Sequence, residues 1–154
     1  MTPPPQRPKD RTPMPERHPL ERAKDFKEVP LGYTEADALR EASRCLQCKR
    51  PTCVPGCPVG VDIPGFIRLI GEGKPIEAYA RLRETNLLPA VCGRVCPQEN
   101  QCEKTCVLVK KGESVAIGRL ERYAADAAAR LMPDPPTVKP VLNGKKVAIV
   151  GSGP

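Results

Sequence analysis

The chain has 154 residues with a net charge of +7, and it contains 20 prolines, eight cysteines, one histidine and no tryptophan. No signal peptide and no run of membrane-spanning length is visible, which argues against a secreted disulfide scaffold and a membrane protein and favours a reducing cytoplasm. Basic residues are interleaved with acidic ones, without a basic run or a stacking platform, so nucleic acid is not an expected partner.

The first segment of the chain is rich in proline. Residues 1–19 hold seven prolines and mixed charges, which predicts a disordered tail. Residues 20–131 follow as an all-α domain. Its first helix is expected to begin at Thr34, with Asp37 three residues later in a capping-box arrangement. The stripe that this helix would bury consists of Ala38, Leu39, Ala42 and Leu46.

Further helices are predicted downstream. One spans about residues 63–70, capped by Asp62, with Phe66, Ile67 and Ile70 buried. Another begins at Pro75, a favourable first helical residue, and ends near Glu84. No alternating strand pattern occurs before residue 145.

A long helix is predicted from about Ser114 to Leu131. Its apolar stripe consists of Ile117, Leu120, Ala124, Ala127, Ala128 and Leu131, and its opposite side of Arg119, Arg122, Asp126 and Arg130. Glu121 falls on the shoulder of the stripe. Two interpretations stay open for it: a boundary glutamate paired with a nearby cation, or an acidic ligand turned toward a metal cluster.

The C-terminal part changes in composition. Residues 132–144 form a proline-rich linker, and residues 145–150 read as a buried parallel strand. Gly151 and Gly153 follow this strand as the first half of a dinucleotide-binding fingerprint. We therefore expect residues 145–154 to be the truncated start of an FAD- or NAD(P)-binding α/β domain.

The cysteines form two blocks of four. The first is Cys45-x2-Cys48-x4-Cys53-x3-Cys57-Pro, and the second is Cys92-x3-Cys96-Pro-x4-Cys102-x3-Cys106. A C-x2-C pair followed by a Cys-Pro is typical of an iron–sulfur protein. Zinc is the alternative, because two sites of four thiolates would also use all eight cysteines, and the chain would then be a non-enzymatic structural or interaction module.

Several segments together resemble a known family. These are CLQC (45–48), CVPGCP (53–58), CGRVCP (92–97), IGRLERY (117–123) and KVAIVGSGP (146–154). They are similar to the N-terminal iron–sulfur domain and the start of the FAD domain of the NADPH-dependent glutamate synthase small subunit. The large subunit of NADH-dependent ferredoxin:NADP oxidoreductase and the N-terminus of dihydropyrimidine dehydrogenase share this architecture.

The resemblance implies an α-helical ferredoxin domain with two [4Fe–4S] clusters. It assigns one cluster to Cys45, Cys48, Cys53 and Cys106, and the other to Cys57, Cys96, Cys102 and Glu121. A glutamine takes the place of Glu121 in dihydropyrimidine dehydrogenase, so this chain sides with the glutamate synthase type. Cys92 is left over as a buried thiol beside a cluster.

The resemblance also implies electron relay. In the full-length parent, electrons would pass between NADP(H), FAD, the two clusters and a second redox subunit or a ferredoxin-like acceptor. The fragment alone would not be a complete catalyst. A docking domain whose clusters are chiefly structural is a third interpretation, which reversible reduction of the clusters would exclude.

Overall fold

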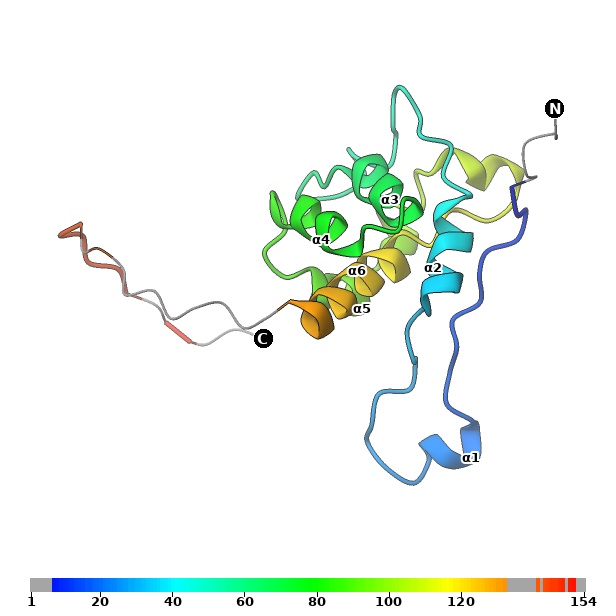
Figure 1. The fold of residues 1–154 in the computed structure, drawn as a ribbon, viewed down its shortest axis with the longest axis horizontal. Coiled ribbons are helices and arrows are strands. Elements are labelled where there is room, and N and C mark those ends of the chain that lie inside the picture. Colours follow the sequence, from blue (N-terminus) through cyan, green and yellow to red (C-terminus); the bar gives the residue numbers. More distant parts are fainter. Residues whose placement is uncertain (1–6, 133–140, 142, 149, 152–154) are drawn as a thin grey trace.

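The computed structural model describes residues 7–132, 141, 143–148, 150 and 151. Within these residues the fold consists of helices joined by turns (Figure 1). The helices are α1 (Pro19–Arg22), α2 (Glu35–Ala42), α3 (Ile63–Gly71), α4 (Pro75–Arg83), α5 (Pro89–Val95), η1 (Gln98–Asn100), η2 (Val107–Lys111) and α6 (Ile117–Leu131). The described residues contain one isolated β-bridge, between Glu16 and Pro30, and no strand. The predicted all-α class is confirmed for this part of the chain.

The core is built around α6, which contacts α2, α3, α4 and α5. Figure 1 shows α6 running through the middle of the helical body. Its Leu120 is fully buried, as are Phe66 of α3 and Leu82 of α4. Because the core is aliphatic and small, packing alone gives the domain little reserve of stability.

Local sequence signals account for the helix starts. Thr34 caps α2, and the capping box with Asp37 is formed as predicted. Asp62 accepts a hydrogen bond from the Gly65 amide at the start of α3, and Pro75 occupies the first turn of α4. In α3 the buried face includes Phe66, Ile67 and Ile70, as the periodicity predicted.

The predicted buried and exposed sides of α6 are confirmed, with two exceptions. Leu131 was expected in the buried stripe but is 67% exposed, because it lies in the last turn beyond the neighbouring helices. Arg122 was expected on the solvent side but is 4% exposed. Its guanidinium pairs with Asp126 and Glu28, and these partners satisfy its charge inside the fold.

The N-terminal segment is not a detached tail. Thr12 is 2% exposed, and its amide donates to Glu41 Oε2 at 2.7 Å. Its carbonyl oxygen accepts from the Tyr33 hydroxyl at 2.5 Å and from Arg119 at 2.9 Å. The predicted disorder is therefore wrong for the stretch around Thr12, while residues 1–6 lie outside the described part. These partners are far away in the chain, so proline content alone could not reveal them.

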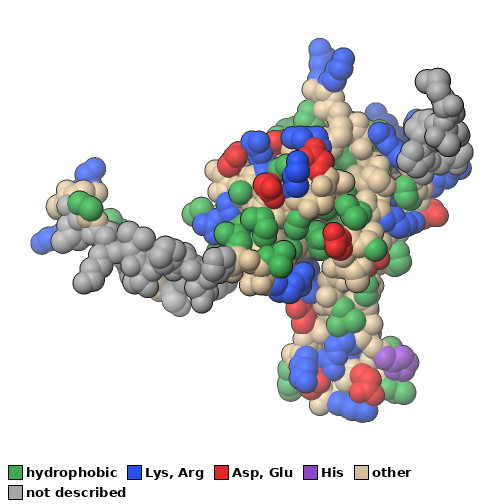
Figure 2. Space-filling model, in the orientation of Figure 1, with side chains coloured by type: hydrophobic (Ala, Val, Ile, Leu, Met, Phe, Trp, Pro, Cys, Tyr) green, Lys and Arg blue, Asp and Glu red, His purple; other side chains and the backbone are tan. Residues whose placement is uncertain are grey.

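Residues 16–30 form an arm that carries α1 at its tip, away from the helical body (Figure 1). Charged side chains of both signs cover this arm (Figure 2). Arg17 and Asp25 pair within it at 2.7 Å, and Glu28 at its base pairs with Arg94 of α5. Ion pairs, rather than an apolar core, thus stabilise the arm.

The C-terminal segment gives no support to the predicted strand. Residues 145–148 and 150 carry no strand, and Ile149 lies outside the described residues, as does most of the predicted linker. A parallel strand needs a neighbouring strand to accept its hydrogen bonds, and the described residues offer none. Gly151 adopts φ 83°, whereas Gly153 falls outside the described part. Among the described helices, none is long and apolar enough to cross a membrane.

Candidate iron–sulfur sites

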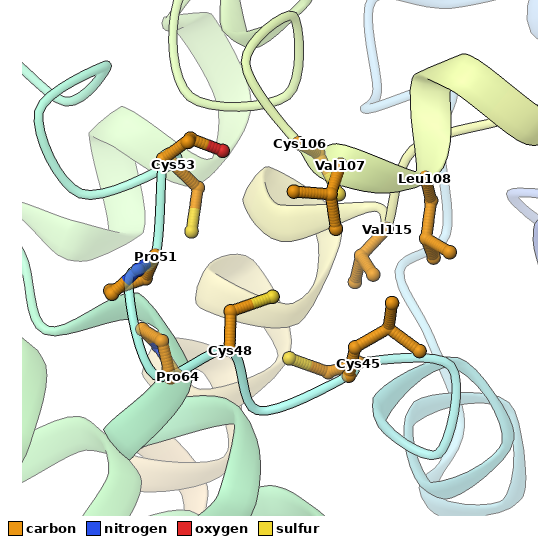
Figure 3. Close-up of a pocket in the computed structure, with 11 residues that line it drawn as sticks. Cys45, Cys48, Pro51, Cys53, Pro64, Cys106, Val107, Leu108 and Val115 are labelled. Carbon is orange, nitrogen blue, oxygen red and sulfur yellow. The ribbon is translucent and has the colours of Figure 1, made fainter.

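Four of the predicted ligands line one apolar cavity. Cys45, Cys48 and Cys53 come from the loop after α2, and Cys106 comes from the segment that leads into η2. Figure 3 shows the sulfur atoms turned toward a shared space. Between them the wall is apolar, formed by Leu46, Pro51, Pro64, Val107, Leu108 and Val115. We call this space the first thiol cavity.

The shape of the first loop has identifiable causes. Gln47 has φ 50°, the left-handed region that non-glycine residues seldom adopt, and this turn lies between Cys45 and Cys48. The Gln47 side-chain amide lies 3.4 Å from Cys45 Sγ and donates to it. Farther along, the Thr52 hydroxyl donates to the Thr105 carbonyl oxygen at 2.5 Å. This bond ties the loop of the first cysteine block to the loop of the second.

Two thiols of this cavity, those of Cys45 and Cys53, have raised pKa values. Burial raises the pKa of Cys45, and the nearby Cys106 and Cys48 raise it further, against a backbone hydrogen bond from Gln47. Burial, together with Cys106 and Cys45, raises the pKa of Cys53 to about 11. Arg7 lowers the pKa of Cys45 slightly, but it does not outweigh the effect of burial. A metal centre would stabilise the thiolate form of these side chains, and thiolates are the ligands that iron–sulfur clusters use.

The other three predicted cysteine ligands form a second group with Glu121. Burial raises the pKa of Cys96 to about 11, with contributions from Cys92, Glu121 and Cys57. Burial, with contributions from Glu103, Cys57 and Glu121, raises the pKa of Cys102 to about 12. Cys57 and Glu121 thus lie near both Cys96 and Cys102. We call Cys57, Cys96, Cys102 and Glu121 the second ligand group.

Gly56 allows the two cysteine blocks to approach at this group. A Cβ at Gly56 would lie 3.1 Å from the Gln101 carbonyl oxygen and 3.2 Å from Cys102 Cα, and would overlap the Thr105 hydroxyl. Cys57 follows directly, so the missing side chain at Gly56 lets its loop pack against the loop of Cys102.

Glu121 of α6 is 9% exposed and lies near enough to Cys96 and Cys102 to raise the pKa of both thiols. Burial raises its pKa to about 7, although a hydrogen bond from Asn86 works in the opposite direction. The Asn86 Nδ2 donates to Glu121 Oε1 at 2.7 Å. Within the described residues no Lys or Arg forms an ion pair with Glu121, so the first interpretation, a boundary glutamate paired with a cation, does not hold.

Asn86 was missed in the sequence analysis, and the burial of Cys92 was described incorrectly. Asn86 lies 35 positions before Glu121, and no local pattern links them. Cys92 was left over by the resemblance, and it lies beside the second ligand group, where it raises the pKa of Cys96. It is half-buried rather than buried, and its Sγ lies 3.6 Å from Asn86 Oδ1.

A site for a single metal ion is not formed. Among the described residues, which include all eight cysteines, no group of three or more Cys, His, Asp or Glu side chains could hold one ion. A tetrahedral zinc site needs its thiolates about 2.3 Å from a common centre. The four thiols of the first thiol cavity are the ligands that iron–sulfur clusters use, and the family match given below does not favour the zinc alternative.

The fold and the two cysteine-rich groups define a helical iron–sulfur domain. The family described as dihydropyrimidine dehydrogenase domain II, 4Fe-4S cluster, matches residues 22–132. The chain belongs to this family.

Curated relatives are considerably longer than the chain. The NADPH glutamate synthase small chains of Halomonas elongata and Escherichia coli are each 43% identical to it, over 141 and 143 residues. The corresponding small chain of Azospirillum brasilense is 38% identical over 147 residues. These matches cover 91%, 91% and 92% of this chain but about 30% of each relative. The chain therefore spans less than a third of the length of these proteins.

Proposed function

We propose that this chain is an electron-transfer domain that holds two [4Fe–4S] clusters. The observation that carries the proposal is the sorting of the predicted ligands into two places. Cys45, Cys48, Cys53 and Cys106 line the first thiol cavity. The second ligand group supplies three further thiols and one carboxylate. Family membership supports the cluster type, and eight ligands suit two clusters with four ligands each.

The residues around each group have separate tasks. When bound, the clusters would take up and release single electrons. The thiols hold them, and the apolar wall of the first thiol cavity keeps water from the sulfur atoms, which affects the reduction potential. Glu121 would provide an oxygen ligand, which is harder than sulfur and distinguishes the second site from the first.

Metal and sulfide analysis tests this proposal directly. Protein purified without oxygen is expected to contain about eight iron and eight labile sulfide per chain, with reversible reduction of both clusters. About two zinc and no sulfide would instead establish the structural zinc module. Clusters that cannot be reduced and reoxidised would identify a domain in which they are chiefly structural.

We also propose that the chain is the front part of an NADPH- and FAD-dependent oxidoreductase of the glutamate synthase small-subunit type. Its relatives named as NADPH glutamate synthase small chains support this assignment, as does their greater length. Residues 145–154, with Gly151 and Gly153, would begin the FAD-binding domain. Electrons would then pass between that flavin and a partner through the two clusters. The experiment is to join the chain to the remainder of such a small chain and measure FAD content and reduction by NADPH.

A partner with an acidic surface is proposed for the side of the first thiol cavity. The exposed cations on its two loops and on η2 are Lys49, Arg50, Lys104, Lys110 and Lys111. Within the described residues none of these forms an ion pair, whereas cations such as Arg68, Lys74 and Arg94 do. Figure 2 shows Lys and Arg side chains at the end of the loop between α2 and α3. Such a patch attracts an acidic second redox subunit or a ferredoxin-like acceptor.

The rate of electron delivery tests the docking side. An acidic flavodoxin serves as the probe, and its reduction by the reduced chain is followed at rising NaCl concentration. The variant Lys49→Glu/Arg50→Glu should slow the reaction at low salt and flatten its salt dependence. Lys24→Glu, in the arm, is the matched control. Equal rates for the two variants would contradict this docking side.

A cytoplasmic location completes the proposal. All eight cysteines are free, and thiols persist in a reducing compartment. Labelling of the protein in intact and fractionated cells checks the location.

A further inference from the structure

The side chain of Asn86 connects three parts of the second site. It is 6% exposed and follows α4. Its Nδ2 donates to Glu121 Oε1 at 2.7 Å. Its Oδ1 accepts from the Leu88 amide at 3.0 Å and from the Cys92 thiol at 3.6 Å. One amide therefore touches both side chains that compete for the fourth place of the second cluster.

The orientation of this amide is determined by the backbone. The Leu88 N–H can only donate, so the atom that faces it must be the oxygen of Asn86. The NH2 group consequently faces Glu121, and Asn86 can meet that carboxyl group only as a donor. The contact is therefore a directed one, from Asn86 to Oε1.

Within the described residues, Oε2 of Glu121 accepts no hydrogen bond. Asn86 provides the one hydrogen bond that Glu121 receives from the described residues, and it goes to Oε1. A buried carboxylate that lacks a cation and further donors is costly to keep in a fold. Cys57, Cys96 and Cys102 lie in the same neighbourhood. Oε2 is thus the oxygen available to a metal.

We propose that Asn86 is a positioning residue that selects Glu121 over Cys92 as the fourth ligand of the second cluster. Its NH2 group holds Oε1 and leaves Oε2 for iron. Its carbonyl oxygen holds the Cys92 thiol through the S–H, so this sulfur is engaged away from the metal. The inference rests on the proposed two-cluster function, and it adds the reason why Cys92, the fourth thiol near this site, is not used there.

The variant Asn86→Leu removes both contacts at similar volume. The protein is purified without oxygen, and iron content, the EPR signals of the reduced clusters and both midpoint potentials are measured. We expect about eight iron, with a changed signal and a shifted potential for one cluster only. Asn100→Leu, an exposed substitution in η1, is the matched control and should change neither. A merely structural role would lower the melting temperature without moving one potential selectively.

The same substitution in a Glu121→Cys protein shows whether Asn86 affects the cluster through Glu121 or directly, by charge or packing. In Glu121→Cys the ligand no longer presents a carboxylate to Asn86, so adding Asn86→Leu should cause no further shift. The same shift in both backgrounds, or unchanged signals in Asn86→Leu with eight iron, would overturn the inference. If Asn86→Leu does not retain its iron, Asn86→Ser, which can still accept from Leu88, is expected to give the selective shift. Absence of eight iron from the unmodified chain would contradict the proposed function instead.

Discussion

Glu41 and Arg44 form an ion pair inside the helical domain, with 2.7 Å between Glu41 Oε1 and the Arg44 guanidinium. The two side chains are 0% and 2% exposed. Glu41 also accepts from the backbone amides of Thr12 and Ala116, and Arg44 donates to the Ser114 carbonyl oxygen. The pair thus joins the N-terminal segment and the start of α6 to α2, directly before the first cysteine block.

The first prediction concerns the removal of this carboxylate. Glu41→Gln keeps the shape but places an NH2 group opposite groups that only donate, and it leaves Arg44 without a counter-charge. Breaking a buried pair in this way costs about 3–5 kcal/mol. We expect a clearly lower melting temperature of the anaerobically purified protein. Glu77→Gln, an exposed change in α4, should alter stability by less than about 0.5 kcal/mol. Equal melting temperatures for the two variants would contradict the structural role of the pair.

A second prediction follows from the protonation of Glu41. Burial would raise its pKa, but the hydrogen bonds from Thr12, Ala116 and Arg44 outweigh burial and lower the pKa below the ordinary 4.5. A lowered pKa in the folded state contributes stability above pH 4.5, and this contribution disappears as the pH falls through the lowered value.

Melting curves across pH check this sign. The difference in melting temperature between the unmodified chain and Glu41→Gln should be constant near neutral pH and shrink below about pH 4.5. Both proteins carry the same clusters, so acid lability of the clusters cancels in the difference. A difference that grows on acidification would mean that the pKa is raised instead.

Local signals in the sequence were sufficient for most of the helical fold. The capping residues Thr34 and Asp62 and the first-turn Pro75 each act within one turn of their helix, so their patterns could be recognised. The position of Thr12 could not, because its burial depends on Glu41 and Arg119, which are distant in the chain. Arg122 was misplaced for the same reason, since its buried charge depends on Glu28 of the arm.

The candidate site likewise has some features that the sequence predicted and others that depend on contacts between distant residues. Cysteine spacing, with the family resemblance, led to the residues that line the first thiol cavity, and the structure brings those four together. Spacing could not reveal Asn86, because its contacts with Glu121 and Cys92 arise only when α5 and α6 pack. Cysteine spacing could not reveal the importance of Gly93 either, because Gly93 matters only where α5 and α6 approach closely.

The third prediction concerns Gly93, where α5 and α6 approach closely. A Cβ at this position would lie 2.6 Å from the Arg122 nitrogen and 2.8 Å from Arg122 Cα. Backbone atoms cannot turn aside as a side chain can, so Gly93→Ala must separate the helices. We expect a loss of about 1–3 kcal/mol. Cys96, a predicted ligand, directly follows α5, so a shift of this helix should also cause partial loss of iron.

Gly71→Ala is the matched control for this change. Gly71 lies at the end of α3, where a Cβ would meet only Ala42 at an ordinary 3.9 Å. Alanine is a better helix former than glycine by about 1 kcal/mol. Thermal denaturation should therefore show an unchanged or higher melting temperature for Gly71→Ala and a lower one for Gly93→Ala. The reverse order would mean that the close approach of α5 and α6 is not required.

The last prediction separates the cysteine that is not expected to bind iron from one that is. Cys92 is held by Asn86 and lies beside the second ligand group, whereas Cys102 is 7% exposed within that group. Cys92→Ala should keep about eight iron, and Cys102→Ala should lose about four. Glu121→Ala should alter the signal of one cluster and leave the other unchanged. Iron analysis and EPR of the three variants make the comparison. If Cys92→Ala loses four iron while Glu121→Ala keeps its native spectrum, Cys92 is the fourth ligand, and the carboxylate serves only the packing of α6.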